Sequence, residues 1–480
     1  MIRTKQHIKS AVYAVCVLTL LGAFGAATAV QQIRGAGADG ETESAENRVL
    51  TAFPSLRTED GAWNKSYTFE LEAWFSEHFA MRSELVTAYG KLSRGAFGVS
   101  SAQDVILGKD GWLYYTPSVS DVTGIRTLDD NEIAHCVRSL QLMDEYAAAH
   151  GAEFVLAVAP NKGSIYPEYL PARYLQTGQP NNLDALMEAL AGSGIAVCDW
   201  RGALRSQADD RLLYHKLDTH WNNDGAMLGY QTLMQTLSLD DRGFAAAART
   251  ETQDWTGDLW KMLSPTQENP DANSTYDIPQ TWNSVGRMRS VDDVTINTTC
   301  ADGEGSLLMF RDSFARALLP MLSQRFAAVT YSRAEAVPLD LLETNPADTV
   351  VYERVERELS DLLIHAPQMP APQREIMRTP DAPGGGVTVK TAESGQYLRI
   401  YGLFDEKYAD AERVYVTAGG ACYEAFPVCE QELLGLEDHC ANGFSLLIPA
   451  EAFPADGSVR VDVQRGGVLT AAGIAKPAAE

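Results

Sequence analysis

Hydrophobic positions between residues 103 and 365 fall into short apolar runs that alternate with longer amphipathic segments. The runs are too short for typical helices and lack the polar alternation of a half-buried strand. The amphipathic segments carry apolar residues at helical spacing, and the first of them has Asp129 at its start and Gly151 at its end. This alternation predicts an α/β fold, a parallel sheet inside an α/β/α sandwich. The predicted strands are 153–160, 195–200, 305–312, 327–332 and 348–355, and the predicted helices are 129–151, 181–194, 223–237, 313–326 and 356–366.

The pattern changes on both sides of this region. Residues 69–92 place aromatic and aliphatic side chains at helical spacing, which predicts a helix packed into a core. Residues 104–115 predict a hairpin that turns at Asp110-Gly111. Residues 366–386 contain five Pro and end in three Gly, so they predict a linker. Residues 387–480 alternate apolar and polar positions between frequent turns, as expected for a small β-sandwich domain.

The N-terminus predicts an exported protein. Arg3, Lys5 and Lys9 precede an uncharged run, residues 11–30, that at ~1.5 Å per residue is long enough to span a bilayer. Positive charges before such a run place the rest of the chain outside the cytoplasm. We therefore expect a single-pass signal anchor in residues 1–30, followed by a flexible stalk in residues 31–47. The alternative is cleavage at Ala27-Thr28-Ala29, which would give a secreted protein.

Composition excludes some functions. The chain has 480 residues, 45% of them hydrophobic, so it can bury several domain cores. Its net charge of −25, with no Lys/Arg-rich stripe, argues against binding to nucleic acid. The seven cysteines include no CxxC pair, which makes a zinc ribbon improbable. A single disulfide among Cys422, Cys429 and Cys440 is compatible with export, but the sequence does not decide the pairing.

Asp312 and Ser313 stand where a predicted strand ends and a helix begins. Reactive groups of a parallel sheet collect at the carboxyl ends of its strands. The first backbone N–H groups of a helix are unpaired there and can receive a developing oxyanion. Ser313 is therefore a candidate nucleophile, with a helix N-cap as the structural alternative.

The stretch "HKLDTHWNND", residues 215–224, supplies partners for such a serine. In an extended segment Asp218 and His220 emerge on the same side, so the carboxylate can hold the imidazole while its other nitrogen takes a proton from Ser313. A metal site would need a third ligand, taken from His215, Asp224 or Asp258. The spacing matches no strong metal motif, so we expect neither a metal nor another cofactor.

These motifs resemble the SGNH-type hydrolases of the DHHW group and the alginate O-acetylation proteins similar to them. The resemblance rests on "LDTHW" before a helix, on "DSFA", and on the order of several shorter motifs between residues 46 and 365. The shorter motifs are "ENR" (46–48), "GKDGWLYY" (108–115), "APNKGSIYPEYLP" (159–171), "WTGDL" (255–259) and "VVYERVER" (350–357). The resemblance implies an SGNH-like catalytic domain over residues 48–365. It also implies Ser313 as the nucleophile, His220 as the base and Asp218 as the carboxylate that orients His220.

Two departures from the family pattern affect the site. Thr219 replaces the first His of the group's name, which leaves the Asp-His pair intact. Arg311 replaces a Gly often found before Asp-Ser, which puts an oxyanion donor there in doubt. The backbone N–H of Ser313 is then the expected donor. Asn161, which follows the strand 153–160, is a second candidate donor, and a turn role is its structural alternative.

The resemblance predicts an exported O-acetyltransferase or acetylesterase that acts on a cell-surface or secreted polysaccharide through an acyl-serine. It also implies a membrane-bound O-acyltransferase as a partner that supplies the acetyl group. The β-sandwich in residues 387–480 is a candidate glycan-binding domain. The alternative is a non-catalytic polysaccharide-binding or scaffold component of an exopolysaccharide assembly, but an intact set of Asp218, His220 and Ser313 argues against it.

Overall fold

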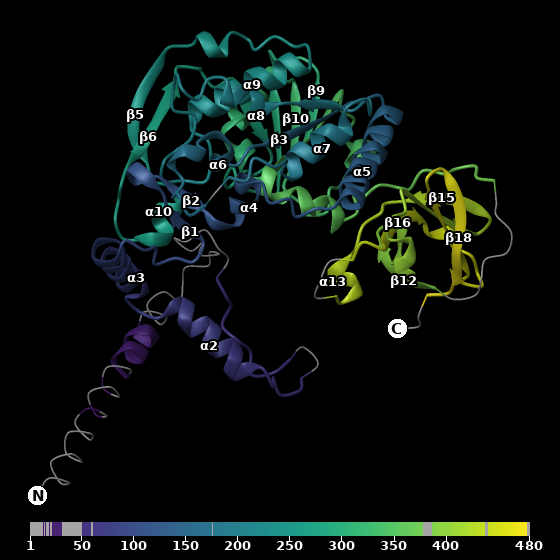
Figure 1. Ribbon diagram of the computed structural model, residues 1–480, viewed down its shortest axis with the longest axis horizontal. Helices are drawn as coiled ribbons and strands as arrows, with labels where there is room; N and C mark the ends of the chain where they lie inside the picture. Colours follow the sequence, from purple (N-terminus) through teal and green to yellow (C-terminus); the bar gives the residue numbers. More distant parts are fainter. Residues whose placement is uncertain are drawn as a thin grey trace, which may run out of the picture. The chain divides into compact units, whose positions relative to one another are not determined.

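The structure is a computed structural model that describes most of the chain (Figure 1). Residues 1–10 at the start of the predicted anchor segment (1–30), part of its uncharged run (11–30) and the whole predicted stalk (31–47) lie outside the described residues. Within the described part of the chain, no helix has both the length and the apolar character needed to cross a membrane. The described residues are 13, 15, 19, 22–30, 50–58, 61–174, 176–377, 386–436 and 440–477.

The chain divides into two compact units. The smaller unit combines Met1–Thr116 with the short segments Lys216–Thr219 and Gln253–Asp271. The larger unit contains Pro117–His215, His220–Thr252 and Ala272–Glu480. We describe each unit separately.

A seven-stranded sheet forms the centre of the larger unit. Its order is β4-β3-β11-β9-β10-β8-β7, and the first five strands are parallel. The last two pairings, β10 with β8 and β8 with β7, are antiparallel. The predicted parallel sheet is thus confirmed, but β7 and β8 were missed because their polar sequences lack an apolar run. The strands are β3 (Glu153–Ala159), β4 (Ala196–Cys198), β7 (Trp282–Val285), β8 (Thr295–Cys300), β9 (Ser306–Phe310), β10 (Ala328–Ser332) and β11 (Thr349–Val355).

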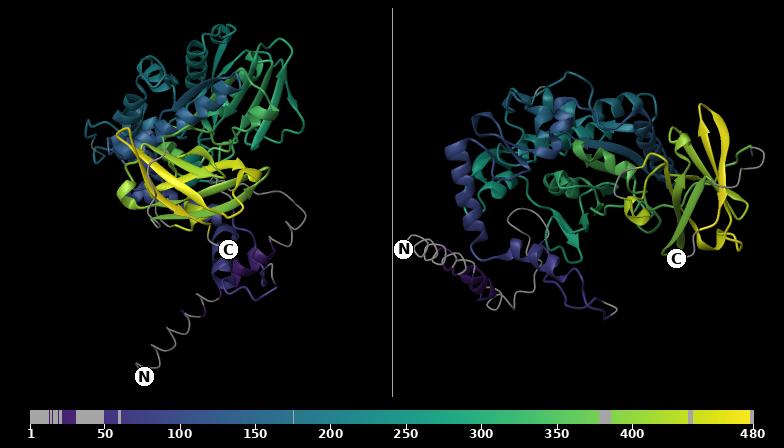
Figure 2. Two further views of the ribbon diagram at one scale, coloured as in Figure 1. Left: turned by 90° about the vertical axis from the view of Figure 1, so that its right-hand side faces the viewer. Right: turned by 60° about the horizontal axis from the view of Figure 1, so that its bottom comes forward.

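Helices cover both faces of this sheet, which confirms the predicted α/β/α sandwich (Figures 1 and 2). One face packs against α5 and α7 in a large apolar core that includes Phe154, Leu156 and Tyr352. On the other face, α8 packs against β3 and α9 against β4. The helices are α4 (Val119–Thr123), α5 (Asp130–Ala149), α6 (Lys162–Ile165), α7 (Asn182–Leu190), α8 (Trp200–Arg205), α9 (Asn223–Thr236), α11 (Leu319–Arg325) and α12 (Leu341–Thr344).

Two predicted helices have a different form. The helix expected at 313–326 is a 3-10 turn, η6 (Phe314–Ala317), followed by α11. Pro320 lies in the first turn of α11, where its missing N–H costs no hydrogen bond, so the chain begins a new helix there. The helix expected at 356–366 is a 3-10 segment, η7 (Glu356–Leu363).

The C-terminal region is β-rich, as predicted. A three-stranded sheet, β12-β13-β16, and a four-stranded sheet, β15-β14-β17-β18, are both antiparallel. Their inward side chains, among them Ile400, Val416 and Val461, form one apolar core. The strands are β12 (Val387–Ser394), β13 (Tyr397–Phe404), β14 (Arg413–Ala418), β15 (Ala421–Ala425), β16 (Gly443–Pro449), β17 (Val459–Arg465) and β18 (Val468–Ala475).

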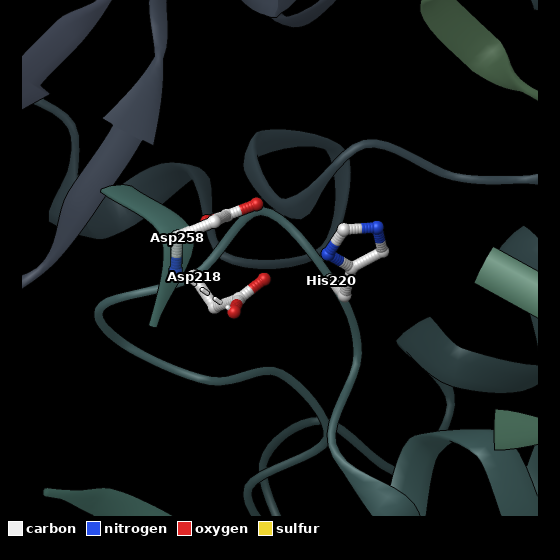
Figure 3. Close-up of side chains that lie close together, drawn as sticks. All are labelled: Asp218, His220 and Asp258. Carbon is white, nitrogen blue, oxygen red and sulfur yellow. Dashed lines mark hydrogen bonds between the residues drawn. The ribbon is translucent and has the colours of Figure 1, made fainter. Parts of the chain in front are cut away.

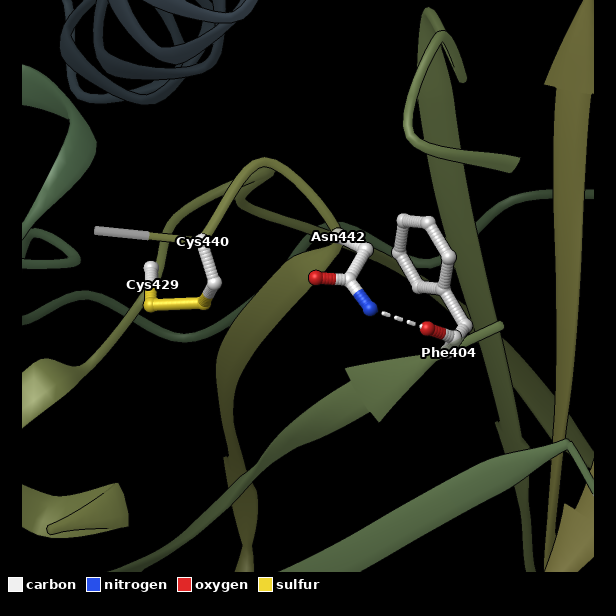
Figure 4. Close-up of a disulfide and its surroundings, with 4 residues drawn as sticks. All are labelled: Phe404, Cys429, Cys440 and Asn442. Carbon is white, nitrogen blue, oxygen red and sulfur yellow. Dashed lines mark hydrogen bonds between the residues drawn. A yellow bond between two sulfur atoms is a disulfide. The ribbon is translucent and has the colours of Figure 1, made fainter. Parts of the chain in front are cut away.

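A disulfide joins Cys429 to Cys440 in this region (Figure 4). It decides the pairing that the sequence left open, because Cys422 is buried and is not disulfide-bonded. Beside it, the side-chain amide of Asn442 donates a hydrogen bond to the carbonyl of Phe404, which holds the start of β16 against the end of β13.

The C-terminal sheets pack tightly against helix α5. Arg138 of α5 forms a bidentate ion pair with Glu424 of β15, at 2.7 and 2.8 Å, and Glu424 is fully buried. Burial alone would raise the pKa of Glu424, but hydrogen bonds from Arg138 and Arg374 lower it below its ordinary value. His135 contacts the carbonyl of Ala411 through Nε2 at 2.8 Å. The α/β sandwich and the C-terminal sheets are therefore joined by a buried charged contact.

Part of the predicted linker takes part in this packing. Ala366, Met369 and Ala371 are buried, and Pro370 forms a bridge with Leu447 of β16. Residues 378–385, which include two of the five Pro and two of the three Gly of the predicted linker, lie outside the described residues.

The smaller unit contains helices α2 (Tyr67–His78), α3 (Arg82–Leu92) and α10 (Asp258–Leu263) and the hairpin of β1 (Val105–Leu107) and β2 (Leu113–Tyr115). Asp110 and Gly111 both have positive φ, as the predicted hairpin turn requires. The segment 69–92 is helical but breaks between α2 and α3. Many of its apolar side chains are exposed, so the prediction that they pack into a core is wrong.

Loss of the buried carboxylate should strongly destabilise the larger unit. Replacing Glu424 by Ala removes the bidentate partner of the buried Arg138, which should cost roughly 3–5 kcal/mol of unfolding free energy. Urea denaturation measures this loss. The matched control is Arg126→Ala, because Arg126 pairs with Asp130 at the surface and should contribute less than about 1 kcal/mol. Equal effects of the two substitutions would contradict the proposed role of burial.

Candidate active site

The loop between α8 and α9 folds back on itself as a narrow hairpin. Tyr214 pairs with Trp221, and the N–H of His215 donates to the carbonyl of His220 at 3.3 Å. The N–H of Asn222 donates to the carbonyl of Leu213 at 3.0 Å. Asn222 then caps α9, because its side chain accepts from the N–H of Gly225. His220 therefore lies on the second arm of a hairpin that is fixed at its base by helix α9.

The structure brings His220 and Ser313 together. His220 Nε2 lies 2.7 Å from Ser313 Oγ, although the residues are 93 positions apart in the sequence. Beside this contact, Trp221 Nε1 donates to the carbonyl of Phe314 at 3.0 Å. The His220 ring also packs on the Phe314 ring, with 4.8 Å between centroids. His220 and Trp221 of the hairpin thus contact Ser313 and Phe314 of the loop after β9.

Ser313 lies at the carboxyl end of β9, before the 3-10 turn η6, and its hydroxyl does not cap that turn. Asp312 takes the capping role instead, since Asp312 Oδ1 accepts from the N–H of Phe314 at 2.7 Å. Within the described residues, the Ser313 N–H donates no hydrogen bond. The serine hydroxyl therefore contacts His220 and does not cap the turn, and the role of its N–H as an oxyanion donor stays a prediction.

The end of β11 holds Asp312 from the other side. Asp312 Oδ2 accepts from the N–H of Val355 at 2.7 Å, and the Asp312 N–H donates to Glu353 Oε2 at 2.8 Å. Glu353 is fully buried, and burial together with the neighbouring charge of Asp312 raises the pKa of Glu353 well above its ordinary value. The raised pKa of Glu353 reduces the negative charge that would otherwise stand beside Asp312.

Arg311 supplies no backbone donor to the site, in agreement with the doubt raised by the sequence. Its N–H donates to the carbonyl of Ser332 at 2.9 Å, which continues the pairing of β9 with β10. Its side chain is buried, and burial with the nearby positive charge of Arg333 lowers the pKa of Arg311 to about 10. Arg311 thus has a structural role, in which its backbone pairs with β10 and its side chain is buried next to the Ser313 loop.

Asp218 lies in the smaller unit, at the tip of the hairpin, and is 3% exposed. Its Oδ2 accepts from Trp255 Nε1 at 2.9 Å and from the N–H of Asp258 at 3.0 Å. Gly257 lies so close that an added Cβ would approach the carbonyl oxygen of Leu217 to 2.1 Å. The "WTGDL" motif is therefore the segment that fixes the Asp218 carboxylate.

Asp258 fixes the same tip through its own side chain. It accepts from the Thr219 N–H at 2.8 Å and from the Thr219 hydroxyl at 2.5 Å. Figure 3 draws Asp218 and Asp258 together with His220, which follows Asp218 by two residues. Within the smaller unit both carboxylates accept hydrogen bonds, Asp218 from Trp255 and Asp258, and Asp258 from Thr219.

Asn161 is placed near the carboxyl edge of the sheet, but the structure does not join it to Ser313. Its Nδ2 donates to Asp121 at 3.1 Å, and its N–H donates to Glu356 at 2.8 Å. The buried Asn161 Oδ1 has no hydrogen-bond partner among the described residues. Its role as an oxyanion donor stays a prediction.

The sequence motifs identified supporting segments without assigning their contacts. In "APNKGSIYPEYLP", Lys162 Nζ donates to the carbonyl of His215 at 3.2 Å, and Tyr166 accepts from the Leu213 N–H at 2.9 Å. Tyr214 in turn donates to the carbonyl of Pro160 at 2.5 Å. Trp255, Asp258 and Glu353 were the positioning residues that sequence reasoning missed. The sequence did mark these residues indirectly, because Trp255 and Asp258 lie in the "WTGDL" motif and Glu353 lies in "VVYERVER".

The larger unit is thus an α/β/α sandwich with a Ser-His pair at the carboxyl edge of its sheet. Residues 105–297 match the family described as SGNH hydrolase-like domain, acetyltransferase AlgX. This match confirms the predicted resemblance to the alginate O-acetylation proteins. Asp218 and His220 lie within the matched residues, whereas Ser313, which contacts His220, lies beyond them.

Curated relatives agree with this class. The chain is 29% identical over 138 residues to the probable alginate O-acetylase AlgJ of Pseudomonas aeruginosa, which covers 29% of this chain and 33% of that protein. It is 22% identical over 344 residues to the protein of the same name from Pseudomonas fluorescens, covering 62% and 78%. The chain thus spans about a third of the first relative's length and about three quarters of the second's.

Solved structures are similar at lower levels of identity. Bacillus cereus PatB1 with a sulfonyl adduct is 20% identical, with a TM-score of 0.44 over 53% of this chain and 95% of that one. A DHHW family protein from Eubacterium siraeum is 14% identical, with a TM-score of 0.42 over 54% and 95%.

Asp121 should make the stability of the protein depend on pH. Burial and the nearby charge of Glu356 raise the pKa of Asp121 to about 7. The unfolded chain ionises this carboxyl near pH 4, so the folded state loses stability as the pH rises from about 4 to about 7, by a few kcal/mol at most. Asp121→Asn should remove this loss, and the difference in unfolding free energy between the variant and the wild type should grow from pH 5 to pH 8. Asp130→Asn, at an exposed position, is the control, and parallel pH profiles for wild type and Asp121→Asn would contradict the shift.

Proposed function

We propose that this protein is an exported O-acetyltransferase that acetylates a polysaccharide through an acetyl-Ser313 intermediate. The observation that carries the proposal is the 2.7 Å contact between His220 Nε2 and Ser313 Oγ at the carboxyl edge of the sheet. An imidazole at this distance can take the hydroxyl proton as the oxygen attacks. The similarity to proteins named as acetyltransferase AlgX and as probable alginate O-acetylases supports acetyl as the transferred group and polysaccharide as the acceptor.

In the first half-reaction Ser313 Oγ attacks the carbonyl carbon of an acetyl ester, and His220 takes the hydroxyl proton. The Ser313 N–H, which has no partner among the described residues, stabilises the oxyanion of the tetrahedral intermediate. When the intermediate collapses, the donor's alkoxide leaves and takes the proton from His220. The product of this step is acetyl-Ser313.

In the second half-reaction a sugar hydroxyl replaces the donor. His220 removes its proton as the oxygen attacks acetyl-Ser313, and Ser313 recovers the proton when the intermediate collapses. Water in place of the sugar would give acetylesterase activity. Asp218, two residues before His220 in the chain, orients the imidazole and stabilises its charged form, while Trp255 and Asp258 hold the carboxylate in place.

Export is supported by the uncharged run at residues 11–30, which follows three positive charges, and by the Cys429–Cys440 disulfide. We propose that the chain stays attached to the outer face of a cell membrane. Acetyl-CoA is not available there, so a membrane-bound O-acyltransferase would deliver the acetyl group to Ser313. The β-rich C-terminal region would then contact the polysaccharide.

The Ser-His-Asp set should behave as one catalytic unit. Ser313→Ala and His220→Ala should each lower hydrolysis of an aryl acetate by on the order of 10³-fold, and the double variant should be no slower than either single one. Asp218→Asn should cost less, since the base remains. Steady-state kinetics measures all four variants. Ser206→Ala and His150→Ala alter an exposed serine and an exposed histidine and should retain full activity.

Covalent labelling separates this site from the alternatives. A fluorophosphonate should label Ser313 in the wild type and in Ser206→Ala, but not in Ser313→Ala. Chelators should leave the aryl acetate activity unchanged. Labelling that survives Ser313→Ala, or activity that a chelator removes, would contradict the proposed mechanism.

Transfer to a glycan distinguishes the transferase from an esterase. The wild-type protein, supplied with an aryl acetate and with either alginate or a neutral oligosaccharide, should produce an O-acetylated sugar that mass spectrometry detects. Because water and sugar compete for the same acetyl-serine, release of free acetate should fall as acceptor is added. Release of all acetyl groups to water at saturating concentrations of both acceptors would support an esterase instead.

A further inference from the structure

The first hundred residues expose an unusual share of apolar side chains. Eleven of the twenty-four exposed large hydrophobic side chains of the described residues lie between Phe53 and Val99. Trp63 and Phe69 are 68% and 75% exposed. Single exposed hydrophobic residues are common, but a concentration of this kind marks a surface that contacts something else.

Helix α3 shows how this surface is organised. Its exposed apolar side chains, together with that of Met81 just before it, recur at spacings of four, four and three, which places them on one face: Met81, Leu85, Tyr89 and Leu92. We call this face the apolar face of α3. The opposite face carries the small buried residues Thr87 and Gly90.

The opposite face is the one packed against the protein. The Thr266 hydroxyl donates to Thr87 Oγ1 at 2.9 Å. A Cβ added to Gly90 would lie 2.2 Å from the carbonyl oxygen of Leu263, at the end of α10. A surface helix of a soluble domain normally packs its apolar side inward. The inverted arrangement of α3 therefore implies an external apolar partner.

We infer that the apolar face of α3 and the neighbouring exposed aromatic residues lie on the surface of a lipid bilayer. The first argument is continuity with the uncharged run at residues 11–30. Thr28 Oγ1 accepts from the N–H of Ala80 at 2.9 Å, and the rings of Phe24 and Phe79 are 6.2 Å apart. The described end of this run, residues 22–30, thus contacts the junction of α2 and α3, which are drawn in dark blue in Figure 1.

The second argument is charge. Residues 1–99 carry ten Lys or Arg and ten Asp or Glu, so the net charge of −25 belongs entirely to residues 100–480. Anionic headgroups would repel the rest of the chain but not this part. Arg82 and Lys91, at the two ends of α3, can contact headgroups while Trp63 and Tyr89 occupy the interfacial layer. This inference rests on the membrane localisation proposed above. It adds a second contact, called here the flat contact, in which α3 lies along the bilayer surface.

Site-specific labelling in vesicles tests this orientation with the full chain. In a Cys16→Ser background, the remaining cysteines of the described residues are buried or disulfide-bonded, so one new cysteine can carry a fluorophore. We place it at Leu85, at Tyr89 or, as a control, at the exposed Asp130 of α5. The protein is reconstituted in phosphatidylcholine vesicles with phosphatidylglycerol and nitroxide-labelled lipid. Labels at positions 85 and 89 should be quenched several-fold more than the label at position 130.

The outcomes separate this inference from the localisation on which it rests. Protein that does not float with vesicles contradicts the membrane localisation and overturns both. Protein that floats with equal quenching at the three positions overturns the flat contact alone. Energy transfer between labels of two copies without lipid quenching would assign the face to a dimer and also overturn it. Leu85→Asp with Tyr89→Asp should weaken vesicle binding several-fold and leave aryl acetate hydrolysis unchanged, which shows that the variant is folded.

Discussion

The hydrogen bond between His220 and Ser313 joins two loops that are separate in the sequence and depend on different supports. It is short enough for proton transfer only while both loops keep their positions to within a few tenths of an ångström. The neighbouring bond from Trp221 to Phe314 restrains the same two loops with uncharged, buried groups. Because that second bond involves no reacting atom, it can hold the geometry while the proton on His220 moves.

Each loop is fixed by backbone contacts more than by its own regular structure. Asp312 accepts N–H groups from both its own turn and the end of β11, so one carboxylate connects two adjacent strands beneath the serine. At the hairpin tip Asp218 and Asp258 accept N–H groups in the same way. Buried carboxylates are expensive to desolvate and are retained when several donors satisfy them. The acidic residues around the site therefore fix the positions of its loops, in addition to any part they take in the reaction.

The sequence predicted the parts of this arrangement that follow from local pattern. Apolar runs predicted the parallel strands, and the position of Ser313 after such a run placed it at the carboxyl edge. The contacts of Asp312 with β11 were not predictable, because they depend on the pairing of strands about forty residues apart. The helix expected at 313–326 failed for a local reason, the proline that restarts it as α11. The assignment of Asn161 as an oxyanion donor remains a prediction. Its side-chain amide donates to Asp121 of helix α4, a contact that the sequence around Asn161 did not indicate.

The misplaced stripe at residues 69–92 shows a further limit of pattern reading. Helical periodicity correctly indicated helices, but it gives only the direction of the apolar face and not what covers it. Gly90 and Thr87 hold the polar side of α3 against α10, so the apolar side is left outward. Because α3 packs through its small residues and exposes its large apolar ones, its contribution to stability depends on whether water or lipid covers the exposed face. In water the exposed face is unfavourable, and against lipid it is stabilising, so the same helix that would weaken a soluble domain strengthens attachment to a membrane.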